Sequence, residues 1–339
     1  MKLMVVGSDK IFAIENFYFK YLSELGVETK TFNAQSFFFD YYQKGILNKL
    51  LFKFGLSGIH RKINILFREA VEKFKPEVIW VFKGMEIFPE SLQWAKQKGI
   101  KLVSFNPDNP FIFTGKGSGN SNVTQSIPLY DLHFTYNHEI EQQLRIRYQS
   151  KIAYLPFGYD VSDEVFEKIK QQPEIMKTCF LGNPDDQRAK FINGLAEMGV
   201  EIDVYGNNWN RFVKHSNITV FNPVFEEELW SVLRRYRVQL NLMRIHNEQS
   251  HNMRSFEAPG IGAIMLAPDT EEHRSFFNNG NEIFLFSNTK DCFEQIQKIL
   301  HLSHEEAEAI RRNARERSIS SGYTYRDRAA FALGVIKGI

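Results

Sequence analysis

The chain has 339 residues, of which 43% are hydrophobic and 24% charged, a composition typical of a folded protein with two domains of ordinary size. Its formal net charge of +2 excludes the strongly basic balance of most nucleic-acid-binding proteins. The cysteines, Cys179 and Cys292, stand alone, which excludes the spacing of a zinc site or a disulfide framework. No run approaches the roughly 18 apolar residues of a membrane span, so we expect a cytoplasmic protein, with peripheral attachment to the inner face of the membrane as an alternative.

Apolar runs alternate with helical patterns through the first half of the chain. The runs cover residues 2–6, 78–82, 102–105 and 132–135. Alternation of short buried strands with helices is typical of a parallel sheet that carries helices on both faces. We therefore expect a doubly wound α/β domain over residues 1–156.

A second alternating set begins after Pro156 and Gly158, where an extended segment ends in a turn. A helix is expected over 188–198, because its apolar residues share one face. We expect a second Rossmann-like domain over 157–322, and a C-terminal helix in 323–339 that packs back on the first domain. The expected strands of the second domain cover residues 178–181, 202–205, 238–242, 263–266 and 283–286.

The loop between the first strand and the first helix of the second domain is a candidate phosphate site. It reads GNPDDQ at 182–187, and Arg188 follows directly. Backbone N–H groups at the start of a helix bind anions, and Arg188 would add positive charge. The functional interpretation makes Gly182, Asn183 and Arg188 contacts of a diphosphate. The alternative is a plain turn in which Asp186 caps the helix.

The segment SHNMRSFEAPGIGAIML at 250–266 carries a cation and a carboxylate three residues apart, Arg254 and Glu257, just before a buried strand. On a helix the two would share a face and could form an ion pair of little energy. The sharper interpretation gives them separate partners. Glu257 would accept hydrogen bonds from both hydroxyls of a ribose, while Arg254 would neutralise a diphosphate leaving group.

Residues 252–266 of this segment, together with EEHRSFFNNGNEIFLF at 271–286 and GYTYRDR at 322–328, resemble the CgeB-like spore-maturation glycosyltransferases. The resemblance implies the GT-B fold, in which two Rossmann-like domains face each other across a cleft. It also implies that the nucleotide sugar binds mainly to the second domain.

The resemblance further implies roles for individual residues. Glu257 would bind the ribose, with Ser255 and Phe256 beside it in the donor site, and the loop after Leu181 would bind the diphosphate. The nucleotide side of the site would be lined by three residues of the YGNNW motif, namely Gly206, Asn207 and Trp209.

Many retaining members of the wider fold also place a carboxylate eight residues before the ribose glutamate. In this chain that position is Gln249, with Glu248 one residue away. Donor-sugar recognition and the stereochemical outcome of the reaction therefore stay open.

The first domain is expected to bind the acceptor through the loops that follow its strands. Asp108, in NPDNP after the strand that ends at Phe105, is the candidate base that deprotonates the acceptor hydroxyl. The alternative is a structural turn in which Asp108 bonds its own backbone. Asp9 and His138 are further candidates for the base.

Neither a cofactor nor a metal is expected, and the donor would be a nucleoside diphosphate sugar, with a UDP-sugar preferred. Basic side chains and helix dipoles can stabilise a departing diphosphate. His246 and His251 lie five residues apart without a third ligand in the sequence nearby, so surface or cleft histidines are favoured over a metal pair.

Residues 36–75 form a regional charge anomaly, with eight basic and three acidic side chains among many aromatic and aliphatic ones. Such a stretch could lie on an anionic membrane, where a lipid-linked acceptor would be met. Helices packed on the sheet, with their lysines and arginines in solvent, explain it without lipid, and this interpretation is favoured.

The sequence therefore predicts transfer of a sugar, preferably a hexose, from a nucleoside diphosphate to a hydroxyl of a glycan or another acceptor. Two other functions remain open: a nucleotide-sugar epimerase on the same fold, and a non-catalytic protein that binds a nucleotide sugar. An epimerase would change the sugar without an acceptor, whereas a binding protein would leave it intact.

Overall fold

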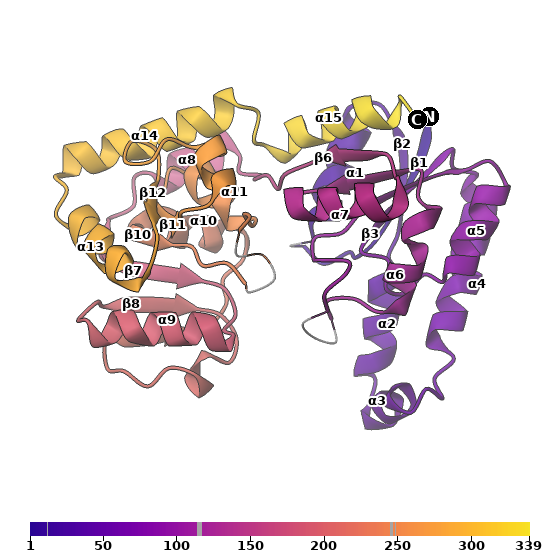
Figure 1. Ribbon diagram of the computed structural model, residues 1–339, viewed down its shortest axis with the longest axis horizontal. Helices are drawn as coiled ribbons and strands as arrows, with labels where there is room; N and C mark the ends of the chain where they lie inside the picture. The colour runs from indigo at the N-terminus through magenta and orange to yellow at the C-terminus, as the bar shows by residue number, and fades with distance from the viewer. Residues whose placement is uncertain (12, 114–116, 245–246, 248) are drawn as a thin grey trace. The chain divides into compact units, whose positions relative to one another are not determined.

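The computed structural model describes residues 1–11, 13–113, 117–244, 247 and 249–339, and these form two compact units. The first unit joins Met1–Pro156 to Tyr325–Ile339, and the second is Phe157–Thr324. Each unit holds a six-stranded parallel sheet with helices on both faces (Figure 1). The predicted doubly wound α/β class is confirmed for both.

The sheet of the first unit has the strand order β2-β1-β3-β4-β5-β6, with β1 in its interior. Its strands are β1 (Lys2–Val6), β2 (Glu28–Phe32), β3 (Val78–Phe82), β4 (Lys101–Phe105), β5 (Leu132–Thr135) and β6 (Ile152–Tyr154). Its helices are α1 (Ile14–Glu24), α2 (Ala34–Gln43), α3 (Ile46–Lys53), α4 (Ile59–Phe74), α5 (Pro89–Gln97), α6 (Ser121–Ser126), the 3₁₀ helix η1 (Ile127–Leu129), α7 (His138–Tyr148) and α15 (Tyr325–Ile336).

Alternation along β3 divides the core of the first unit between the two faces of the sheet. Ile79 and Val81 point toward one face, where apolar residues of α4 and α5 cover them. Trp80 points to the other face, and its ring lies 4.8 Å from that of Tyr18 in α1. On this face α15 packs against α1, and the ring of Tyr325 stacks on Phe17 at 4.6 Å.

The sheet of the second unit has the order β12-β11-β10-β7-β8-β9, so β7 and β10 lie at its centre. Its strands are β7 (Ile175–Leu181), β8 (Ile202–Tyr205), β9 (Ile218–Phe221), β10 (Tyr236–Leu240), β11 (Met265–Pro268) and β12 (Phe284–Phe286). Its helices are α8 (Asp163–Ile169), α9 (Asp186–Glu197), the 3₁₀ helix η2 (Trp209–Arg211), α10 (Glu226–Arg235), α11 (Arg254–Gly260), α12 (Glu271–Phe276), α13 (Thr289–Leu300) and α14 (His304–Ser320).

Helix ends of the second unit follow local capping rules with one correction. Helix α14 starts with a capping box, in which Ser303 and Glu306 each bond the other's backbone N–H. Helix α9, however, is capped by Asp185, whose side chain accepts from the backbone N–H of Arg188, so the alternative that placed the cap at Asp186 is wrong. The helix begins at Asp186, directly after this cap and two residues before the expected start at Arg188.

Three strands of the described chain, β2, β6 and β9, do not appear among the expected strands. Each lies at an edge of its sheet, and at most one residue of each strand is buried. The buried apolar runs that identify central strands are therefore missing from them. Among the helices that the structure describes, none has the length and apolar content to cross a membrane.

Candidate functional site

In parallel sheets, ligands bind beyond the carboxyl ends of the strands. In the second unit, hydrogen bonds join the loops that follow β7 and β8 at this edge. The indole N–H of Trp209 donates to the carbonyl oxygen of Gly182 at 2.8 Å, and the backbone N–H of Asn207 donates to Asn183 Oδ1 at 2.9 Å. A Cβ atom on Gly206 would lie 2.3 Å from the Gly182 oxygen, so only glycine fits there. Five predicted donor-site residues thus meet where β7 and β8 end.

Trp209 is fully buried, so its ring supports the loop after β7 from within the fold. The side chain of Asn207 is exposed, and its backbone is held by Asn183. The loops after β7 and β8 are therefore joined to each other. The buried Trp209 supports them, and Asn183 and Asn207 supply their polar groups.

Arg188 is a buried cation directed toward backbone carbonyls. Its Nη1 donates to the oxygen of Asn183 at 3.2 Å and its Nη2 to the oxygen of Leu242 at 2.7 Å. Burial lowers the pKa of its guanidinium to about 10, and Asp185 acts in the opposite direction. Arg188 therefore joins the loop after β7 to the chain just after β10 and places positive charge beneath that loop.

Helix α11 carries the ion pair that its spacing allowed. Arg254 Nη1 donates to Glu257 Oε2 at 2.6 Å. Burial raises the pKa of the Glu257 carboxyl, and the charge of Arg254 lowers it. Arg254 Nε is buried and has no hydrogen-bond partner among the described residues. A buried Glu257 carboxylate without a partner would cost free energy, and Arg254 supplies that partner. The Arg254 guanidinium still has an N–H group that can donate to a ligand.

Two further predicted donor-site residues, Ser255 and Phe256, are fully buried and hold α11 in place. Ser255 Oγ accepts from Asn241 Nδ2 at 3.1 Å and lies 2.8 Å from Nε2 of His273. The ring of Phe256 packs edge-on against Tyr323 at 5.2 Å. Sequence reasoning missed Asn241 and His273, which come from the end of β10 and from α12.

The protonation of His273 determines which groups donate in this hydrogen-bond network. It is buried, and burial lowers its pKa to about 4, so its ring is neutral at physiological pH. Nδ1 lies 2.9 Å from the carbonyl oxygen of Pro268, which can only accept, so Nδ1 carries the proton. Nε2 is then an acceptor for the Ser255 hydroxyl, and the direction of each bond to α11 is determined.

Two residues considered in the sequence, Glu248 and His246, lie outside the described residues. His251 is described and fully buried, and its Nδ1 contacts Glu272 Oε2 at 2.5 Å. Gln249 is exposed.

The same edge of the first unit carries a different set of groups. Lys83, just after β3, has its backbone in the left-handed region at φ 65° and donates from Nζ to Asp108 Oδ2 at 2.6 Å. The turn at NPDNP is made by Asn106, whose Oδ1 accepts from the backbone N–H of Asp108 at 3.0 Å. The turn is thus closed by Asn106, and the hydrogen bond given for the Asp108 carboxylate goes to Lys83 rather than to its own backbone.

Two buried carboxylates accompany this pair, and sequence reasoning did not select either as a base. Burial raises the pKa of Glu15 and of Glu86 to about 7, while the charge of Lys83 lowers both. Glu15 Oε1 accepts from the backbone N–H of Ser8 at 2.6 Å, at the turn after β1. Glu86 could have been selected from the sequence, because it lies four residues beyond the buried strand β3, in a loop where site residues are expected.

The other candidate bases have different neighbours. Asp9 is exposed and accepts from Ser36 Oγ. His138 is 61% exposed at its side chain, lies 3.1 Å from Glu141 Oε2 and stacks on Tyr154.

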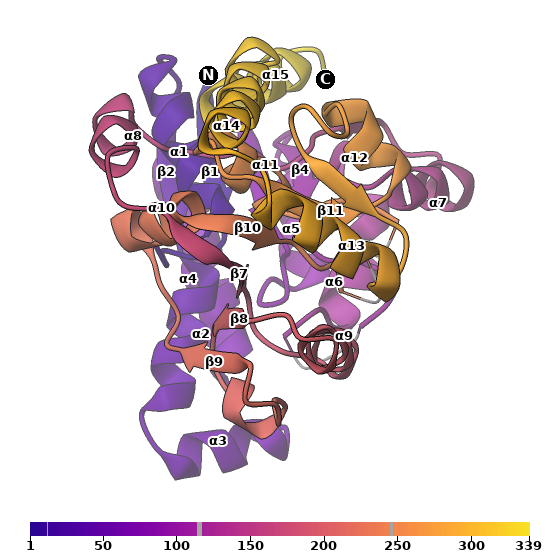
Figure 2. The ribbon, with the colours of Figure 1, turned by 90° about the vertical axis from the view of Figure 1, so that its left-hand side faces the viewer.

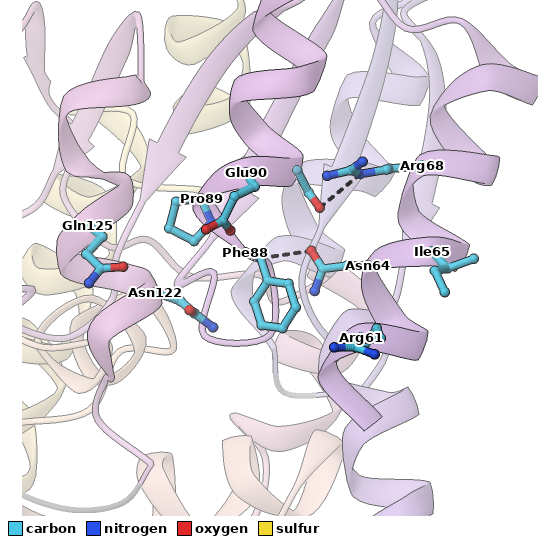
Figure 3. Close-up of a pocket in the computed structure, with 10 residues that line it drawn as sticks. Arg61, Asn64, Ile65, Arg68, Phe88, Pro89, Glu90, Asn122 and Gln125 are labelled. Atoms are coloured by element: carbon cyan, nitrogen blue, oxygen red, sulfur yellow. Dashed lines mark hydrogen bonds between the residues drawn. The ribbon is translucent and has the colours of Figure 1, made fainter. Parts of the chain in front are cut away.

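A pocket of about 570 Å³ opens between α4, α5 and α6 (Figure 3). Asn64 at its wall accepts from the backbone N–H of Phe88 at 2.8 Å and donates to the carbonyl oxygen of Glu86 at 2.9 Å. The wall of the pocket is therefore continuous with the loop that carries Lys83 and Glu86. Its other polar lining residues are Arg61, Arg68, Glu90, Ser91, Asn122 and Gln125.

Comparison with known proteins gives a family match in the second half of the chain. Residues 187–334 match a family model described as glycosyl transferase-like. A sequence search of curated proteins finds no significant match. The C-terminal half is therefore glycosyltransferase-like, and the prediction of a glycosyltransferase is borne out at that level. The narrower CgeB-like resemblance stays a prediction.

Solved structures match the whole chain at low identity. Sucrose-phosphate synthase from Thermosynechococcus elongatus has a TM-score of 0.69 and 11% identity, over 100% of this chain and 98% of that chain. HepE from Anabaena in complex with UDP-glucose has a TM-score of 0.66 and 11% identity over 100% of both chains. UDP-GlcNAc 2-epimerase from Neisseria meningitidis has a TM-score of 0.60 and 13% identity over 100% of both chains. These likenesses confirm the GT-B type of fold.

Proposed function

We propose that this protein transfers a hexose from a nucleoside diphosphate sugar to an acceptor hydroxyl, with the donor bound by the second unit. The observation that carries the proposal is the Arg254–Glu257 pair in α11, at the sheet edge where the loops after β7 and β8 are joined. The pair lies within the stretch that matches the glycosyl transferase-like model.

The donor site would work through charges that the fold already holds. Glu257 would accept hydrogen bonds from the two ribose hydroxyls, which are the hydrogen-bond donors that a buried carboxylate requires. Arg254 would then turn its guanidinium donors to the diphosphate, with the positive charge of Arg188 beneath the neighbouring loop. These arginines would stabilise the leaving group without a metal ion.

The preferred nucleotide is UDP. HepE, which shares the fold, binds UDP-glucose, and this supports a UDP-hexose donor here. In the reaction, the bond from the sugar C1 to the diphosphate oxygen breaks, and its electron pair leaves with the nucleoside diphosphate. A new bond forms between C1 and the acceptor oxygen, which loses its proton to a base.

We assign that base to Asp108 in the first unit. Its carboxylate is partly open to solvent, at 28% side-chain exposure, whereas Glu15 and Glu86 are buried. Lys83 holds Oδ2, which leaves Oδ1 to accept the proton of an acceptor hydroxyl. An acceptor such as a glycan would reach Asp108 along the loop of Lys83 and Glu86, which continues into the wall of the pocket between α4, α5 and α6.

The test of the donor site is thermal unfolding with UDP, GDP, dTDP, CDP and ADP, because a ligand that binds only the folded state raises the Tm. We expect UDP to raise the Tm of the wild type and to lose this effect in Glu257→Gln. Glu271→Gln changes an exposed glutamate of α12 and should respond like the wild type. Equal stabilisation of both variants by UDP would refute the ribose role of Glu257.

A nucleotide-sugar epimerase is the second candidate, because the Neisseria epimerase shares the two-unit fold. Incubation of the protein with UDP-hexoses separates the functions. Conversion to an epimer without acceptor would establish the epimerase and reject the transferase. Release of UDP that depends on an added glycan acceptor would establish transfer, and binding without turnover under either condition would leave a binding protein.

A further inference from the structure

The surface of α3 differs from the rest of the helical layer of the first unit. None of its residues is buried. Ile46 is 78% exposed, Leu47 64% and Leu50 44%, and the two apolar residues that follow the helix, Phe54 and Leu56, are 69% and 73% exposed. Isolated exposed apolar side chains are normal, but five within eleven residues form a patch that requires an explanation.

The opposite side of α3 is firmly attached, so the exposed side is a fixed feature. The ring of Phe52 lies 4.9 Å from Phe38 in α2 and 5.7 Å from His60 in α4. Asn48 Nδ2 donates to the carbonyl oxygen of Tyr41 at 2.8 Å. Ile46, Leu50 and Phe54 recur at intervals of four, on the side of the helix away from Phe52.

Figures 1 and 2 both show α3 at the far end of α2 and α4, remote from the sheet of the first unit. We call the exposed residues of this end the α3 tip. It comprises Lys44, Ile46, Leu47, Lys49, Leu50, Lys53, Phe54 and Leu56.

The charge around the α3 tip has one sign. Residues 41–68 contain six lysines and arginines and no acidic residue. Lys44, Lys49 and Lys53 are all exposed, and none of them forms an ion pair within the described residues. Many other lysines of the chain do, among them Lys83 with Asp108. The tip therefore presents apolar side chains next to uncompensated positive charge.

We propose that the α3 tip docks the protein on an anionic phospholipid bilayer. A short amphipathic helix with leucine and phenylalanine on one side and lysines beside them places its apolar side at the boundary of headgroups and acyl chains, while lysines attract the anionic headgroups. Lysine stems can lie along apolar surface with their charges at the headgroups. Because none of the described helices could cross a membrane, this association is peripheral.

A second copy of the chain is a poorer occupant. Two tips that met about a two-fold axis would bring six unpaired lysines together, and like charges repel. An anionic bilayer satisfies both parts of the tip, because it removes the apolar side chains from water and neutralises the lysines. The sequence interpretation that packed residues 36–75 on the sheet holds for Phe38 and Phe52, which pack on the first unit's core.

The test is co-sedimentation of the full chain with vesicles. We expect binding to vesicles of phosphatidylcholine with about 30% phosphatidylglycerol, no binding to phosphatidylcholine alone, and weakening as NaCl rises from about 50 to about 500 mM. A Leu47→Ser/Leu50→Ser/Phe54→Ser variant should lose binding. A Lys44→Gln/Lys49→Gln/Lys53→Gln variant should bind roughly 100-fold more weakly at low salt, at about fivefold per lysine.

Ile146→Ser is the matched control, because Ile146 is 73% exposed in α7 of the same unit. This variant should bind vesicles like the wild type. Thermal unfolding of each variant verifies that it is folded. The proposal is overturned if the wild type does not bind anionic vesicles, or if the triple serine variant binds as well as the wild type. It is also overturned if light scattering shows a dimer that this variant dissolves, since a second copy would then cover the tip.

Discussion

The two units have the same architecture but carry different charged groups in the loops after their strands. In the first unit, Lys83 donates to Asp108, and its charge lowers the pKa of the buried Glu15 and Glu86. In the second unit, the buried Arg188 lies beside Asp185, and Arg254 pairs with Glu257. A parallel sheet determines where a site can form, and the residues in its loops determine what that site can bind.

The difference fits a division of the proposed reaction. Excess carboxylate in a buried setting favours uptake of a proton, which is what activation of an acceptor hydroxyl requires. Buried guanidinium groups stabilise the negative charge that develops on a departing diphosphate. If this comparison is right, substitutions at the two edges should affect different measured quantities.

The largest effect is expected at the base. Asp108→Asn should lower kcat by roughly 100- to 10,000-fold, because the amide cannot accept the proton, and should leave stabilisation by UDP unchanged. Steady-state kinetics and thermal unfolding with UDP measure the two. Asp131→Asn is the control, since Asp131 lies in the same unit and pairs with Lys96. If Glu86→Gln removes activity while Asp108→Asn retains it, the base is Glu86.

Arg254→Met should lower kcat/KM by roughly 100- to 1,000-fold and also abolish stabilisation by UDP, because the guanidinium binds the leaving group. Arg274→Met, at an exposed arginine of α12, is its control. Activity that persists unchanged in Arg254→Met would show that the leaving group is stabilised elsewhere.

Gly206→Ala tests the joined loops. Its new methyl group would lie 2.3 Å from the Gly182 oxygen, so we expect a loss of about 1–3 kcal/mol in the free energy of unfolding, measured with urea. Gly194→Ala is matched to it, because Gly194 lies inside α9, where the added methyl meets its nearest neighbour only at 3.8 Å. That control should be stabilised by roughly 0.5–1 kcal/mol. Similar unfolding energies for the two variants would argue against the close approach.

The smallest effect concerns pH. The folded pKa of about 7 for Glu15 and Glu86 lies above the ordinary value of 4.5, so the folded state favours their protonated forms. Their contribution to stability is complete below the ordinary pKa and is lost as pH rises through 7. We expect Glu86→Gln to flatten the fall in Tm over this window, whereas Glu24→Gln, at an exposed site in α1, should follow the wild type. An equal fall in Tm with pH in both variants would contradict a raised pKa for Glu86.

Local patterns were enough to predict much of the fold. The buried runs of β1 and β3 and the capping box at Ser303 depend on residues a few positions apart, so the sequence alone predicts them. The Arg254–Glu257 pair is also local, because a helix brings residues three apart onto one face. The edge strand β2 was missed, since ETKTF lacks a buried apolar run.

The tertiary structure decided where the charges act. Lys83 meets Asp108 only because β3 and β4 are neighbours in the sheet, and burial raises the pKa of Glu15 and Glu86 only once helices cover that sheet. Which side of α3 stays in solvent likewise depends on the packing of Phe52 against α2 and α4. Composition and periodicity by themselves determined two doubly wound domains and a candidate motif. The partners of each charged group depend on contacts between residues distant in the sequence, which no local pattern contains.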